Sequence, residues 1–263
     1  MNRFRHLSLI GLLAAGLSST GAYADVKADE IIKASLDRKS PTDMMAISTM
    51  NITDRTGVVK VRKLKEVTKE TAEGTKAYIE FVEPADVNGT KFLTVSRKGA
   101  ETDQRIYLPA LKKIRKISAS GKDADFLGSD LCYFDMEKRY FEDGTYTLLA
   151  EGDTLPEPQF AGMQFAKIST VYKVANAPYS KAVAWYNTEN MLPYKVECYD
   201  KKDDSLLKTI TMDEVKTIKG YPMTMKTTIV NIKKGSKTEM LMTDVALDAG
   251  VKDSEVSLKR LEQ

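Results

Sequence analysis

Histidine, the side chain that most often acts as a general base, occurs only once in this 263-residue chain. Its single histidine, His6, lies in a segment with two early arginines, an apolar stretch at residues 7–17 and the small-residue site Ala22-Tyr23-Ala24. That pattern predicts a signal peptide, residues 1–24, cleaved after Ala24. The remaining chain then has no histidine, which excludes a histidine-activated nucleophile, a histidine general base and a histidine-ligated zinc ion. We expect no catalysis, no metal and no cofactor.

The other reactive groups have simpler interpretations. Ser129 and Asp130 are adjacent, but without a histidine they are expected to cap a short helix that carries Leu131, Tyr133 and Phe134. The Asp and Glu residues form no distinctive pair for acid–base hydrolysis. Cys132 and Cys198 are the only cysteines, and they form either a disulfide, as an oxidising compartment favours, or two buried free thiols.

The signal peptide also predicts where the protein works. Cleavage would leave Asp25, not a cysteine, at the new N-terminus, so a lipid anchor is not expected. No later stretch approaches eighteen consecutive apolar residues, which predicts a soluble periplasmic protein. The formal net charge of +3 falls to +1 once the two early arginines leave, and nucleic-acid binding is not expected. Residues 25–263 show no repeat or composition break, so we expect a single domain and a monomer.

The stretch 103–135 organises the rest of the chain. Ile106 and Leu108 alternate with more polar neighbours, Pro109 interrupts the pattern, and residues 112–117 resemble a returning strand. A three-residue loop, 109–111, would set Ile106 opposite Ile114. The opposite face would then hold Arg105, Tyr107, Lys113 and Arg115. Opposed like charges destabilise a sheet, so either the register differs by one residue or an anion meets that face.

A helix is the alternative for the same residues. Leu108, Leu111, Ile114 and Ile117 recur every three positions, which suits a helix with Pro109 in its first turn. The pattern alone leaves both structures open.

The remaining segments are mostly strands. Residues 29–39 predict an amphipathic helix that Ser40-Pro41 ends. Period-two patterns then follow at 44–53, 58–67, 76–82, 91–97, 144–151, 165–174, 183–186, 193–199, 207–212, 223–232 and 238–245. About eleven strands at spacings of roughly 8–12 residues favour an antiparallel sheet that curls or closes.

Several sequence motifs together resemble a known family. They are Pro84–Thr90, Asp103–Ile117, Gly128-Ser129-Asp130 with Tyr133 and Asp135, Pro193–Asp200 with Leu207-Lys208, and Asp244–Leu261. With the signal peptide and the N-terminal helix, they resemble the LolA/LolB-like periplasmic carrier superfamily. The chain is most similar to the outer-membrane lipoprotein-sorting-like proteins found beside resistance–nodulation–division (RND) transporters.

The resemblance implies a fold and a ligand. The expected fold is mainly β (α+β): an incomplete, half-open antiparallel β-barrel of about eleven strands with an N-terminal helix and short lid helices. The concave apolar face of this barrel would hold an acyl chain. The resemblance also favours the hairpin over the helix at Pro109. The large apolar side chains are then either ordinary core or the pocket wall. These candidates are Phe81, Phe92, Ile106, Leu108, Phe126, Leu131, Tyr133, Trp185, Met240 and Met242.

Two further features concern the surface and the lid. Arg105, Lys113, Arg115 and Lys116 form a basic cluster that is either a solvated strand face or a dock for lipid headgroups or an acidic partner. We expect this cluster to face away from the pocket. The small polar residues that follow, 118–133, predict a lid that opens at low cost.

The sequence therefore predicts a periplasmic carrier of a lipid or lipoprotein acyl chain. Its expected partners are an RND-family inner-membrane transporter and an outer-membrane acceptor. The alternatives are a lipid-sensing accessory subunit of a membrane transporter and a histidine-independent hydrolase.

Overall fold

One antiparallel sheet of 13 strands makes up most of the molecule. The computed structural model describes residues 19–263. The strands are β1 (Asp43–Thr53), β2 (Val59–Thr71), β3 (Gly74–Glu83), β4 (Lys91–Ser96), β5 (Asp103–Leu108), β6 (Lys113–Lys116), β7 (Gly144–Asp153), β8 (Phe165–Tyr172), β9 (Tyr179–Asn187), β10 (Pro193–Asp200), β11 (Leu206–Ile218), β12 (Tyr221–Asn231) and β13 (Ser236–Leu247).

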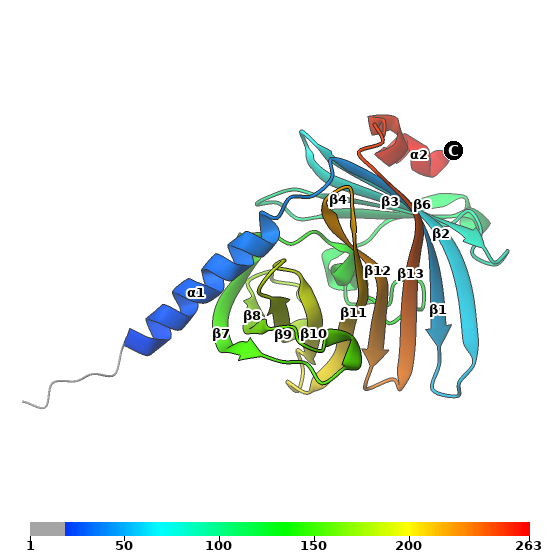
Figure 1. Ribbon diagram of the computed structural model, residues 1–263. Helices are drawn as coiled ribbons and strands as arrows, with labels where there is room; N and C mark the ends of the chain where they lie inside the picture. Colours follow the sequence, from blue (N-terminus) through cyan, green and yellow to red (C-terminus); the bar gives the residue numbers. More distant parts are fainter. Residues whose placement is uncertain (1–18) are drawn as a thin grey trace, which may run out of the picture.

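The strand order explains why the sheet is open. It runs β6-β5-β4-β3-β2-β1-β13-β12-β11-β10-β9-β8-β7, so the first and last strands pair in the middle and β6 and β7 are the two edges. Because each strand twists relative to its neighbour, a sheet this wide curls. Figure 1 shows it curling from β1 and β2 round to β7 and β8. The half-open antiparallel barrel is confirmed, with 13 strands where about eleven were predicted.

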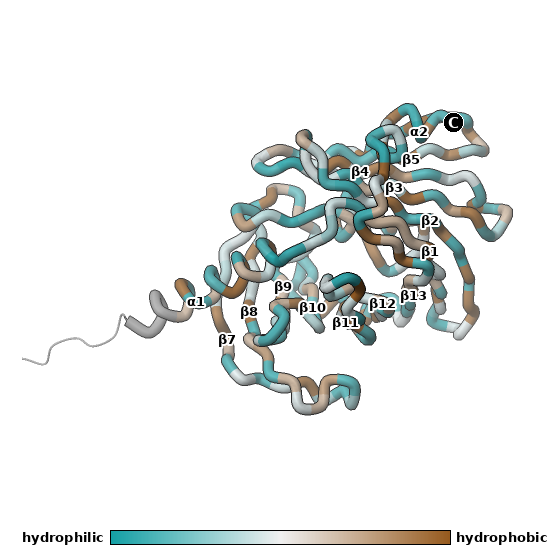
Figure 2. The backbone as a smooth tube through the Cα atoms, turned by 45° about the horizontal axis from the view of Figure 1, so that its top comes forward, coloured by the Kyte–Doolittle hydropathy of each residue, from teal (hydrophilic) through white to brown (hydrophobic). Residues whose placement is uncertain are grey.

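Alternation along the strands separates an inner face from an outer one. On β1 the residues at even positions from Ala46 to Ile52 are buried, and their neighbours are half-buried. Figure 2 shows the same mixture of hydrophobic and hydrophilic residues along the strands. The period-two signal therefore gave the strand positions well, with ends that differ by a few residues.

The N-terminal helix α1 (Ser19–Leu36) covers part of the inner face beside β7. Its Ala28 and Ile32 are buried against Tyr146 on β7 and Ile168 on β8. The helix was predicted at 29–39, but it begins ten residues earlier and ends three earlier. Of the predicted signal peptide, residues 1–18 lie outside the described residues. No helix in residues 19–263 is long and apolar enough to cross a membrane.

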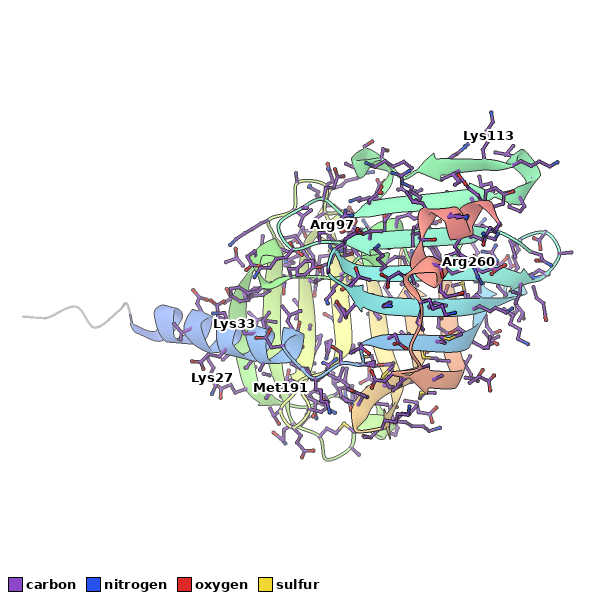
Figure 3. All side chains as sticks on the ribbon, turned by 90° about the horizontal axis from the view of Figure 1, so that it is seen from above. Lys27, Lys33, Arg97, Lys113, Met191 and Arg260 are labelled. Carbon is purple, nitrogen blue, oxygen red and sulfur yellow. The ribbon has the colours of Figure 1, made fainter. Side chains whose placement is uncertain are left out.

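The C-terminus covers part of the outer face in the other half of the sheet, over strands β2–β5. The 3-10 helix η6 (Asp253–Val256) and helix α2 (Leu258–Glu262) bury Val256 and Leu261 against Val67, Tyr78 and Leu93. The Arg260 guanidinium lies 5.6 Å from the centre of the Tyr78 ring, and Figure 3 shows it above the strands. The chain's own C-terminal segment therefore occupies this part of the outer face.

Candidate functional site

The connection from β6 to β7 crosses the open side of the sheet. These strands follow one another in sequence, yet they are its opposite edges. The connecting chain must pass from edge to edge, and its side chains pack on the inner face. It contains the short 3-10 helices η2 (Ala119–Gly121), η3 (Tyr133–Met136) and η4 (Phe141–Asp143). We call residues 118–136 the plug segment.

Phe126 is the centre of the plug segment. Its side chain is fully buried, and its ring centre lies 5.1 Å from that of Phe92, 5.7 Å from Tyr133 and 6.0 Å from Phe81. Such tilted and edge-on pairs add to the stabilisation from apolar burial. The same cluster contains Met50, Ile52, Leu64, Ile79, Ile106, Leu131 and Ile229, with Leu108 and Met240 packed against it. The plug segment thus fills this half of the inner face with its own side chains.

A tight turn presents Phe126 to the sheet. The Phe126 N–H donates to the carbonyl of Leu131 at 2.7 Å, and the Ser129 hydroxyl donates to the Phe126 carbonyl at 2.8 Å. Between them Gly128 has φ +78°, which glycine adopts without the steric cost that other residues have. The Gly128-Ser129-Asp130 motif is therefore a turn, not a helix cap.

Asp130 ties this turn to β13. It accepts hydrogen bonds from the hydroxyls of Ser236 and Thr238, the latter at 2.7 Å. Lys234, just before the strand, pairs with Asp125 at 2.5 Å. The expected cap at Ser129 or Asp130 was wrong: η3 begins at Tyr133, and the Asp135 carboxylate accepts the N–H of Cys132 at 2.8 Å.

A buried ion pair holds the other end of the plug segment. The Lys208 ammonium on β11 lies 2.5 Å from the Asp135 carboxylate, and the side chains are 3% and 8% exposed. The Tyr179 hydroxyl donates to the same carboxylate at 2.6 Å. Burial lowers the pKa of Lys208, but the Asp135 charge outweighs it and the net shift is upward. Lys208 therefore keeps its positive charge at neutral pH.

Cys132 and Cys198 are free thiols in one apolar cluster beside this pair. Burial, with the Asp135 charge, raises the pKa of Cys132 to about 11 and that of Cys198 further. A thiol is nucleophilic only as the thiolate, so neither residue is an active nucleophile at neutral pH. In the part of the chain that the structure describes, no three His, Cys, Asp or Glu residues could hold a metal ion.

A cavity of about 360 Å³ lies beyond the plug segment on the inner side of the sheet. It lies between the linker after α1 and the ends of β1, β2, β12 and β13. Four methionines contribute to its wall, Met44, Met212, Met223 and Met242, and Arg38 lies at its margin. Its size falls in the range of small-molecule sites.

Most of the predicted pocket residues lie together. Phe81, Phe92, Ile106, Leu108, Phe126, Leu131, Tyr133 and Met240 form or adjoin the plug cluster, whereas Met242 lines the cavity. Trp185 lies elsewhere, packed with Phe160, Phe165 and Leu192. Its indole N–H donates to Asp153 at 2.9 Å, and the Lys167 ammonium lies 4.5 Å from its ring centre.

The hairpin at Pro109 is confirmed, and the helix alternative is wrong. Pro109–Leu111 is a short 3-10 turn, η1, between β5 and β6. Ile106 pairs with Arg115 and not with Ile114, so the register is the one shifted by a residue. Arg105 therefore lies opposite Lys116 instead of Arg115, and the Asp103 carboxylate beside both offsets their like charges.

The shifted register divides the basic cluster between two faces. Lys113 and Arg115 pair with Leu108 and Ile106, so they belong to the inner face at the edge of the sheet. Arg105 and Lys116 lie on the outer face beside Asp103, at 3.1 and 3.8 Å. The expectation that all four face away from the pocket was wrong. Figure 3 shows Lys113 on the edge strand, pointing away from the sheet.

The full or partial burial of three polar residues was not predicted from the sequence. Glu66 on β2 has its Oε1 buried without a hydrogen-bond partner, and burial raises the pKa of its carboxyl despite a hydrogen bond from Ser48. Arg38 resembles any other basic residue in the sequence, and the Leu207-Lys208 motif does not reveal that Lys208 is buried. Glu66 was detectable in principle, because it shares the strand face of buried Leu64.

The fold is shared with solved lipoprotein-sorting and LolA-like proteins. A model of a family described as "-like: Uncharacterized protein" matches residues 73–263, so the chain belongs to that family. No curated protein matches the chain significantly.

Solved structures give the same fold. A DUF1329 family protein from Desulfovibrio piger is 25% identical over 90% of this chain and 99% of its own, with a TM-score of 0.85. A proposed outer membrane lipoprotein-sorting domain from Vibrio parahaemolyticus is 27% identical over 91% and 100%, with a TM-score of 0.84. A LolA superfamily protein from Nitrosomonas europaea is 18% identical over 92% and 100%, with a TM-score of 0.66, and shows the fold alone.

Proposed function

We propose that this protein is a periplasmic carrier that binds one acyl chain of a lipid or lipoprotein in its inner face and delivers it toward the outer membrane. The burial of Phe126 against the inner face is the main support for this proposal. This loop residue occupies the apolar face of a sheet whose edges are unpaired with each other. An acyl chain offers the same apolar contact as the aromatic side chains it would replace.

Binding would then be an exchange of one apolar filling for another. The plug segment covers the inner face when the carrier is empty and moves aside when an acyl chain enters. Its polar anchors, Asp125, Asp130 and Asp135, hold three separate points and fix the closed position. A ligand shifts such an equilibrium by its preference for the open form.

The chain's own chemistry favours carriage over catalysis. The two thiols are protonated, and no histidine follows His6. The predicted signal peptide, residues 1–24, supports a periplasmic location. The likeness to the Vibrio lipoprotein-sorting domain supports an outer-membrane acceptor. An RND-family transporter as donor rests on the family resemblance.

Delipidated protein and a fluorescent fatty acid provide the test. We expect saturable uptake of the fatty acid and its transfer to acceptor vesicles. While the ligand enters and leaves, the backbone amides of residues 118–133 should be less protected from hydrogen exchange than those of strands β1–β3. Native mass spectrometry of protein from the periplasm should show a bound lipid. Failure of every acyl probe to bind the delipidated protein would contradict the carrier function.

A further inference from the structure

The methionine-lined cavity is continuous with the surface that the plug segment covers. On β13, Met242 lines the cavity and Met240 packs against the plug cluster. Residues two apart on a strand share a face and lie about 7 Å apart. Ser48 and Met50 oppose these methionines across the β1–β13 pair. An acyl chain could therefore lie in both regions without leaving the inner face.

Arg38 is an unusual residue for the margin of such a cavity. It lies in the linker between α1 and β1, and its Nη1 donates a long hydrogen bond of 3.4 Å to the Ser35 carbonyl. Its Nε is buried without a hydrogen-bond partner, and within residues 19–263 its guanidinium forms no ion pair. The side chain as a whole is half-buried. Partial burial of a charge without a counter-ion is unfavourable, which favours an anion at this point.

Two carboxylates also line the cavity, but both have other partners. Asp43 accepts the backbone N–H groups of Ala249 and Gly250 at 2.8 and 3.2 Å. Glu70 accepts from the Lys138 ammonium at 2.8 Å. Neither is in ion-pair contact with Arg38, so the guanidinium fork remains available for a ligand.

We propose that this cavity binds the head end of an amphiphile whose head group is a carboxylate or phosphate. Arg38 binds the anionic head group, and the first part of the acyl chain lies among Met44, Met212, Met223 and Met242. The rest of the chain continues past Met240 into the space that Phe126 occupies in the closed form. Methionine suits this wall because its flexible thioether adapts to a variable chain, and guanidinium matches both anions with two parallel hydrogen bonds.

The proposal deepens the carrier function and rests on it. The test uses three fluorescent probes with the same acyl chain, ending in a carboxylate, a phosphate monoester or a methyl ester. Their affinities are measured for the wild type, Arg38→Gln, Arg38→Lys and Arg97→Gln. The last is a matched control, because Arg97 lies on the β4–β5 turn outside the cavity. Thermal unfolding of each variant checks the fold.

We expect Arg38→Gln to weaken the two anionic probes about tenfold, the size of a lost charge-assisted hydrogen bond, and to leave the methyl ester unchanged. Arg38→Lys should recover part of the loss because it keeps the charge, and Arg97→Gln should match the wild type. A larger loss for one anion than for the other identifies the head group. The head-group site would be refuted if Arg38→Gln bound all three probes as tightly as the wild type. It would also be refuted if Arg38→Gln lost as much affinity for the methyl ester as for the anionic probes. If the wild type binds the probes, the carrier function stands whatever the Arg38 variants show. If the wild type binds none of them, both the carrier function and the head-group site are refuted.

Discussion

Replacing Phe126 by alanine should separate the stability of this protein from its affinity for lipid. The ring is fully buried and packs against three aromatic rings at 5.1–6.0 Å. Truncating a buried phenylalanine to alanine costs about 3–5 kcal/mol. In a simple core, that loss would impair every function of the fold. Here the lost contacts belong to the closed form alone, because the plug segment leaves the inner face when an acyl chain enters.

The expected result is thus a less stable protein that binds lipid more tightly. Apparent affinity scales with the fraction of molecules in the binding-competent form. Each 1.4 kcal/mol taken from the closed form raises that fraction tenfold until the open form predominates. Phe126→Ala should therefore improve the dissociation constant of a fluorescent fatty acid by at least about tenfold. Urea unfolding and titration of the same sample measure both effects.

Phe160→Ala is the matched control. Phe160 is also buried and packs against two aromatic rings, but it belongs to the cluster around Trp185, away from the plug segment. It should lose similar stability without a gain in affinity. If Phe126→Ala binds lipid no better than the wild type, or changes affinity as Phe160→Ala does, the plug segment does not compete with the acyl chain and the exchange mechanism is refuted.

Three further predictions concern the inner face and its edge. Leu108→Glu places a charge against the plug cluster and should abolish most fatty-acid uptake while preserving the sheet signal in circular dichroism; unchanged uptake would exclude Leu108 from the lining. The pKa of the Glu66 carboxyl is raised above its ordinary 4.5 in the fold, so its ionisation costs stability as pH rises through the folded pKa. Glu66→Gln should raise the melting temperature at pH 7–8 and lose this advantage near pH 4, whereas a constant difference would exclude titration of this group. Changing Lys113 and Arg115 together to Gln should slow transfer to anionic vesicles at low salt and not at high salt, with Lys116→Gln as the control on the outer face; equal rates for both variants would leave the inner pair as a solvated edge.

The strands were predictable because their signal is local. Alternation along residues 44–53 or 193–199 reports which side chains face inward, and the turns between strands carry their own residue preferences. The register of β5 and β6 was not predictable. The loop contains Lys112 as well as Pro109–Leu111, and Lys112 adopts a left-handed conformation with φ 48°. This extra loop residue shifts the pairing by one residue. That shift moved Lys113 and Arg115 to the inner face, because a single step reverses every side chain.

The candidate site was only partly predictable for a different reason. Phe81, Phe92 and Phe126 could be selected as large apolar residues, and the structure brings them together. Trp185 satisfied the same criterion but lies in another cluster, because alternation does not identify which of two faces is the inner one. Lys208 pairs with Asp135, and the Nε of Arg38 has no hydrogen-bond partner. Both situations depend on how segments far apart in sequence pack together. Such contacts leave no pattern in the neighbouring residues.

The strand order itself explains why a core of this kind can move. In a closed barrel the interior is filled by strand residues, which cannot leave without unfolding the sheet. In this chain, β1 pairs with β13 in the middle, so the edge strands β6 and β7 are consecutive and their connection must cross the interior. The filling of that half of the inner face thus comes partly from a segment that contributes no strand to the sheet. Its removal breaks Asp125–Lys234, Asp135–Lys208 and the Phe126 contacts, but no strand pairing. The sheet can therefore remain intact while its filling is exchanged, which is the property that a carrier of acyl chains requires.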